Sequence, residues 1–322
     1  MSTEIIEISA DDAASLKTAH QLLENPGVVA KLSSLIGEPI EAGLKSLPEN
    51  VSSAISTAVK KAVEAAFGVA LKTMDLETPD EPSKSRMPGW LQKTTSAAGG
   101  LVGNMFASDS KVPEEKSAVS KASNFWHKAA VATTGAVGGA FGLSAILIEL
   151  PVSTTIMMRS IADVARSEGE DLTTEEARTQ CVSVLAFGGR SKDDDDAEVG
   201  YFAVRQAMAS LVTDAAAQLA KEGGTGVSTV LVQLINQVAE RFGTTVTPKV
   251  MAQLVPVIGA ASGAAINTLF IDHFQNMARG HFTVRRLERK YNVPLIESEY
   301  RKLTQLALAK EQSARLPSNA AV

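Results

Sequence analysis

The chain has 322 residues, of which 45% are hydrophobic and 5% aromatic, with a formal net charge of −5 and one cysteine. A chain of this length can bury a core without disulfides. A single cysteine excludes an internal disulfide framework and a cysteine-based metal cluster. The negative charge argues against general nucleic-acid binding. The acidic start, MSTEIIEISADD, lacks the apolar segment of a signal peptide, so we expect a cytoplasmic protein.

The first part of the chain shows apolar residues at helical spacing and no sustained period-two pattern of a β-strand. Asp11 or Asp12 is expected to cap a first short helix. The helices predicted in this part run to Leu23 and then cover Val28–Ile36, Glu38–Leu47 and Glu49–Met74.

Glu77–Pro88 contains three prolines and mixed charges, which predict a solvated linker. A glycine-rich apolar helix, Trp90–Phe106, follows it. We therefore divide the chain into four regions. These are an N-terminal helical region (1–76), a linker with a short apolar helix (77–115), a large helical domain (116–314) and a disordered tail (315–322).

The second half of the chain has clearer helix boundaries. Thr173-x-x-Glu176 has the pattern of a capping box, and the helix that it starts is expected to end near Phe187. Three more helices are predicted at Tyr201–Lys221, Val227–Phe242 and Glu297–Ser313.

Two long runs without any charged residue, Ala129–Ile148 and Val250–Ile271, are the most unusual feature of the chain. Both contain glycines four residues apart, a spacing that lets a second helix backbone approach closely. These are Gly135 and Gly139 in the first run, and Gly259 and Gly263 in the second. We expect an all-α protein, a multi-helix bundle with two central Gly/Ala-rich apolar helices.

The length of these runs permits a membrane span, because about 20 residues cross a bilayer. Their many small and polar residues bring the mean hydropathy close to the threshold for membrane helices. A helix that is buried on all sides inside a soluble bundle has the same composition. Two interpretations therefore stay open at this point, a buried core helix and a segment that enters or lies on a membrane.

Two blocks of motifs resemble the EcsC protein family over roughly residues 115–292. The first block contains Glu149-Leu150-Pro151-x-x-Thr154-Thr155, the stretch MRSIADVARSEGEDL, Phe187-Gly188-Gly189 and Gly200-Tyr201-x-x-x-Arg205. The second contains Asn267-x-x-Phe270-x-x-His273, Ala278-Arg279-Gly280-His281-Phe282 and Arg286-Leu287-Glu288-x-x-Tyr291. The resemblance implies a bacterial and mostly helical protein, and it does not supply a reaction.

The charge-free run Val250–Ile271 leads into a basic segment, where a helix C-terminus favours cations. Cationic side chains of this kind bind phosphate or lipid head groups. The candidates for such binding are Arg279, Arg285, Arg286, Arg289 and Lys290.

A different set of residues would suit a metal-assisted hydrolase, namely Glu149, Asp163, Asp272, His273 and His281. The two histidines are eight residues apart, or about 12 Å along a helix, so they cannot chelate one ion by themselves. Structural histidines are the competing interpretation. Likewise, Glu149, Arg159 and Asp163 fit a buried ion network, with Arg159 as a candidate partner of Glu149 and Asn267 as a structural residue.

No cofactor is expected, since the chain lacks a Walker A motif and a GxSxG nucleophile motif. We therefore predict a non-enzymatic helical protein that associates peripherally with the inner membrane or with a membrane-protein partner. The alternative is a metal-assisted, peptidase-like hydrolase, and the sequence leaves the oligomeric state open.

Overall fold

The structure, a computed structural model, describes residues 7–24, 49–73, 143–187, 200–221, 228–254 and 256–315. Within these ranges all regular secondary structure is helical, which confirms the predicted all-α fold. The predicted helices at 28–36 and 38–47, the linker at 77–115 and the tail after residue 315 lie outside the described residues. The four-region division of the chain stays a prediction.

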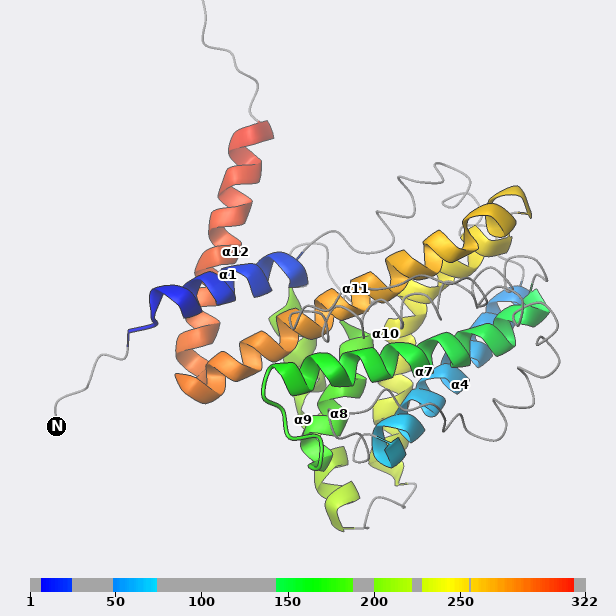
Figure 1. Cartoon of the computed structure of the whole chain (residues 1–322), viewed down its shortest axis with the longest axis horizontal. Helices are drawn as coiled ribbons and strands as arrows, with labels where there is room; N and C mark the ends of the chain where they lie inside the picture. The colour runs from blue at the N-terminus through cyan, green and yellow to red at the C-terminus, as the bar shows by residue number, and fades with distance from the viewer. Residues whose placement is uncertain are drawn as a thin grey trace, which may run out of the picture.

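The described helices are α1 (Ala10–Leu23), α4 (Glu49–Thr73), α7 (Leu143–Ser167), α8 (Glu175–Ser183), the short 3-10 helix η1 (Val184–Ala186), α9 (Tyr201–Lys221), α10 (Thr229–Leu254), α11 (Pro256–Lys290) and α12 (Val293–Arg315). Helix α11 packs against α7, α10 and α1, while α4 packs against α7 and α10. Figure 1 shows α1 and α12 at one end of the molecule, and the first residues of α7 and α11 at the other.

The charge-free run Val250–Ile271 does not form one helix, which corrects the sequence interpretation. Helix α10 continues through Pro248 to Leu254, and α11 begins at Pro256. Proline is favoured at the first position of a helix because its missing N–H has no partner there in any case. The run is therefore the tip of a helical hairpin, with its first residues in α10 and the remainder in α11.

Three helix starts differ from the predicted ones. Ser9 caps α1, because its side chain accepts a hydrogen bond from Asp12 N–H, and the Asp12 carboxylate is used elsewhere. Thr174 caps α8, one residue after the predicted Thr173. Asn292 has a positive φ of 151° and accepts a hydrogen bond from Leu295 N–H at the start of α12. In each case a short polar side chain satisfies an otherwise unpaired helical N–H.

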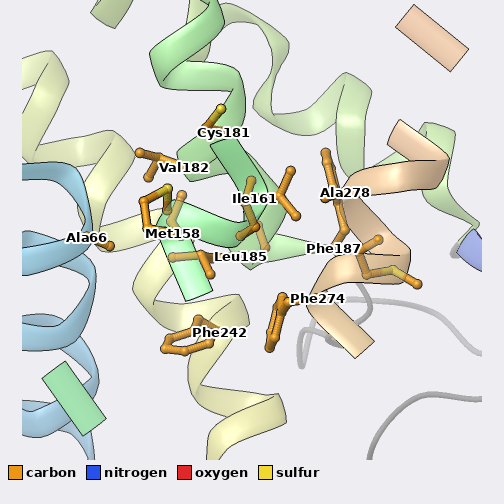
Figure 2. Close-up of a cluster of buried hydrophobic side chains, with 14 of the residues drawn as sticks. Ala66, Met158, Ile161, Cys181, Val182, Leu185, Phe187, Phe242, Phe274 and Ala278 are labelled. Carbon is orange, nitrogen blue, oxygen red and sulfur yellow. The ribbon is translucent and has the colours of Figure 1, made fainter. Parts of the chain in front are cut away.

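The core lies between α4, α7, α8, α10 and α11 (Figure 2). Phe242 of α10 and Phe274 of α11 pack edge to face with ring centroids 5.4 Å apart, beside Met158 and Ile161 of α7. Small residues such as Ala66 let α4 approach this cluster closely.

The close glycine contacts expected in the apolar helices stay a prediction. Gly135 and Gly139 lie outside the described residues, and Gly259 and Gly263 belong to a part of α11 whose side chains are not described. Among the described residues, no helix combines the length and the apolar character that a membrane crossing requires.

Candidate functional site: the polar seam of helix α11

Helix α11 carries a row of buried polar side chains along the bundle. Asn267, His281 and Glu288 are separated by 14 and 7 residues, so they lie along one stripe of the helix. All three are at most 8% exposed, and each meets a polar side chain of another helix. We call this row the polar seam. Each of its residues needs a partner, because an unpaired polar group buried at this depth would be costly.

The first cluster of the seam joins α7, α10 and α11. Lys249 Nζ donates to both carboxylate oxygens of Glu149, at 3.0 and 3.4 Å, and Asn267 Nδ2 donates to the same carboxylate at 2.9 Å. Lys249 is fully buried, and its ammonium lies 4.9 Å from the centre of the Phe270 ring. The charge of Glu149 is therefore matched inside the core by a cation and an amide, and the Lys249 ammonium also faces an aromatic ring.

Lys249 was not predicted from the sequence as the partner of Glu149. Arg159 was the candidate, because it is closer to Glu149 in the chain. The structure pairs Asp163 with Arg166 at 3.2 Å and places Lys249, 100 residues away, on Glu149. One signal could have found it. Glu149 follows the last residue of one charge-free run, and Lys249 precedes the first residue of the other. A buried anion and a buried cation at the borders of two packed apolar segments are expected to pair, because each stabilises the charge of the other.

The second cluster surrounds His281. The Tyr201 hydroxyl lies 2.7 Å from His281 Nδ1, and Gln180 Oε1 lies 3.1 Å from His281 Nε2. A neutral imidazole fits these partners, accepting from the hydroxyl and donating to the amide oxygen. The Phe187 ring packs against the imidazole with centroids 4.8 Å apart. Burial, with smaller contributions from Arg205 and Arg285, holds the pKa of His281 well below its usual value.

This buried histidine predicts a pH dependence of stability. The unfolded chain takes up a proton near pH 6.5 and the folded chain does not, so stability falls as the pH drops below about 6.5. Replacing His281 with Gln should remove about 1.4 kcal/mol per pH unit from the slope of unfolding free energy between pH 6 and 5. Urea unfolding across this range measures the slope. A His20→Gln control keeps the His281 contribution, and an unchanged slope in His281→Gln would contradict the assignment.

The third cluster ties α9 to the end of α11. Arg205 donates from its two Nη atoms to the two oxygens of Glu288, at 2.7 and 2.6 Å. The guanidinium also lies over the Phe202 ring, 5.7 Å from its centre. This two-pronged geometry fixes the position of both side chains. Between the first and second clusters, Gln275 donates to the Ser160 hydroxyl at 2.6 Å.

The predicted head-group binders lie at the end of α11, where carboxylates of the same chain contact four of them. Arg285 bonds to Glu170 at 2.9 Å and to Glu176 at 3.0 Å, and Arg289 also bonds to Glu170. Arg286 bonds to Glu168 at 2.8 Å and Lys290 to Asp12 at 2.6 Å. The fifth, Arg279, donates to Asn276 at 3.1 Å. Head-group binding by these cations stays a prediction, and any ligand would compete with these carboxylates.

Two of the candidates for a hydrolase site, Glu149 and His281, lie far apart. Glu149 contacts Asn267, whereas His281 lies 14 residues further along α11, or about 21 Å. No group of three or more His, Cys, Asp or Glu side chains among the described residues has the arrangement of a metal site. Cys181 is buried, and burial raises the pKa of its thiol far above the usual value. It is therefore an inert core residue.

Comparison with known proteins gives one match. The model of the EcsC protein family matches residues 15–287, which extends the similarity from the motif blocks into the N-terminal helices. No curated protein and no solved structure matches the chain.

Proposed function

Since the chain belongs to the EcsC protein family, whose model covers most of its length, we propose that it is a non-enzymatic protein that inserts one end of its helical bundle into one leaflet of a membrane. The inserting part is the charge-free end, which we define as residues 143–148 of α7, 250–254 of α10 and 256–266 of α11. We infer a cytoplasmic protein bound to the inner membrane.

The observation that carries this proposal is the ion pair between Glu149 and Lys249. Glu149 borders one charge-free run and Lys249 borders the other, and they meet inside the bundle beside Asn267. The chain beyond this pair in α7, α10 and α11 contains no charged residue until the helices end. Figure 1 shows these ends on the same side of the molecule, opposite α1 and α12. An apolar end of this kind suits hydrocarbon better than water.

The length of the charge-free end supports shallow insertion. From Pro256 to Asn267 helix α11 rises by about 16 Å. The hydrocarbon core of a bilayer is about 30 Å thick, so one leaflet is about 15 Å. Away from the helix termini, the backbone N–H and C=O groups of this end are paired within each helix, so these groups can enter lipid without losing hydrogen bonds.

The basic end of α11 supports a mode of binding that does not depend on anionic lipids. Helix α11 has 35 residues and is about 52 Å long, so the charge-free tip and the basic C-terminus lie far apart. Carboxylates already match the charges of Arg285, Arg286, Arg289 and Lys290. We therefore expect binding through apolar contact, with little dependence on salt.

Flotation with phosphatidylcholine vesicles tests the proposal. The wild-type protein should float with these neutral vesicles at both low and high salt. The double substitution Val257→Lys and Ile258→Lys should reduce the bound fraction at least tenfold, because a lysine in the hydrocarbon region costs about 2.5–3.5 kcal/mol. Two adjacent positions, which lie about 100° apart around the helix, are changed so that a wider part of its circumference carries charge.

The matched control carries Leu306→Lys and Leu308→Lys on α12, where both side chains are more than half exposed. This control should bind vesicles like the wild type, and circular dichroism should show that both double variants keep their helices. The proposal fails if the wild-type protein stays in the lipid-free fraction, or if the Val257/Ile258 variant floats as well as the wild type. Binding only to anionic vesicles, lost at high salt, would point to the basic end instead.

A further inference from the structure

Helix α1 lies on the surface formed by α11 and α12 and presents one stripe of side chains to it. Asp12, Leu16, Ala19, His20 and Leu23 are buried, at positions i, i+4, i+7, i+8 and i+11. The rest of α1 is largely exposed. This spacing is the one by which amphipathic helices dock into grooves on other proteins.

Polar contacts fix the start of α1. The Asp12 carboxylate accepts hydrogen bonds from Lys290 at 2.6 Å and from the Tyr291 hydroxyl at 2.7 Å, and it lies 3.5 Å from Arg286. The Tyr291 hydroxyl also accepts from Ser9 N–H at 3.1 Å. Arg286, Lys290 and the Tyr291 hydroxyl therefore hold the carboxylate in the first turn of α1.

The other end of α1 is held by shape and by a second carboxylate. A Cβ atom on Gly280 would lie 2.5 Å from Leu23 Cγ and 3.1 Å from the Ala19 carbonyl oxygen, so the glycine lets α1 approach α11 closely. His20 Nε2 bonds to the Thr304 hydroxyl at 3.0 Å, and Glu24 accepts from the Tyr300 hydroxyl at 2.8 Å. The surface thus has a basic end and, at the other end, a close approach at Gly280 beside hydroxyl groups of α12.

We propose that this α11–α12 surface is a docking groove for an amphipathic helix of a partner protein, which α1 occupies within its own chain. The partner helix carries a carboxylate in its first turn and small or aliphatic residues four, seven and eleven positions later. Charge complementarity to Arg286 and Lys290 and the close approach at Gly280 select this occupant. The groove lies at the end of the molecule opposite the charge-free end, and it does not depend on the membrane proposal.

The full-length protein can be tested with a fluorescent peptide of residues 7–24. In the Asp12→Lys protein, repulsion from Arg286 and Lys290 should release α1 and leave the groove intact. The native peptide should then bind at least tenfold more tightly than it binds the wild type, as measured by fluorescence anisotropy. A peptide that itself carries Asp12→Lys should not bind. Amide hydrogen exchange over residues 10–23 reports whether α1 has been released.

A Gly280→Ala protein provides the steric control, because the added methyl group fills the groove for α1 and peptide alike. It should expose the α1 amides without gaining peptide binding. Gly68→Ala is the matched control, since nothing lies within 4 Å of a Cβ there, and it should keep α1 protected. The proposal fails if the α1 amides stay protected in Asp12→Lys or if the native peptide does not bind once α1 is released. It also fails if Gly280→Ala binds the peptide as tightly as Asp12→Lys does. A dimer formed by exchange of α1 would identify a second copy as the occupant and would also overturn it.

Discussion

Replacing Lys249 with Met should lower the free energy of unfolding by about 3–5 kcal/mol, the usual cost of removing one partner of a buried ion pair. Among the described residues, Glu149 would then keep the Asn267 amide as its one partner, inside a core where an unmatched carboxylate is unstable. The cation over the Phe270 ring would be lost as well. Urea unfolding measures the loss, and the melting temperature should fall on the order of 10 °C.

The double variant Glu149→Gln/Lys249→Met separates the loss of the pair from the burial of a single charge. A neutral glutamine can still accept from Asn267, so most of the lost stability should return. The matched control is Lys302→Met, which removes a lysine that is 62% exposed and should change stability by less than about 0.5 kcal/mol. If the single and double variants were equally unstable, the pair itself would be the source of stability. That outcome would contradict the assignment of the cost to an uncompensated carboxylate.

Replacing Glu170 with Ala should have two large effects, one on stability and one on membrane binding. Glu170 is buried and bonds to Arg285 and Arg289, so its removal leaves two cations with fewer partners and should cost about 3 kcal/mol. The freed cations should also create salt-sensitive binding to phosphatidylglycerol vesicles that the wild type lacks. Unfolding in urea and flotation at two salt concentrations measure these effects.

The control for this variant is Glu176→Ala, since Glu176 is 64% exposed and shares Arg285 with Glu170. Its removal should cost less than about 1 kcal/mol and add little anionic binding. Burial raises the pKa of Glu170, but the bonds from Arg285 and Arg289 outweigh it and hold that pKa below its usual value. The contribution of this carboxylate is therefore complete at neutral pH and declines as the pH falls below about 4.5. Stronger binding of the wild type to anionic than to neutral vesicles, lost at high salt, would show that the basic end is free after all.

Local patterns in the sequence were sufficient to locate some of the helices. The predicted helix Tyr201–Lys221 has the bounds of α9, and Glu49–Met74 differs from α4 by one residue. Apolar spacing and capping residues act within a few positions along the chain, so they can be read without knowing the fold. The motif blocks were likewise sufficient to identify the family.

Tertiary structure alone decided which charged and polar groups meet. Lys249 lies 100 residues from Glu149, Gln180 lies 101 residues from His281, and Asp12 lies 278 residues from Lys290. The fold also divided the run Val250–Ile271 between two helices, and it covered with carboxylates a basic segment that looked free to bind a membrane. The physical reason is that a charge is stabilised by whichever group packs against it, and packing brings together residues that no local pattern connects.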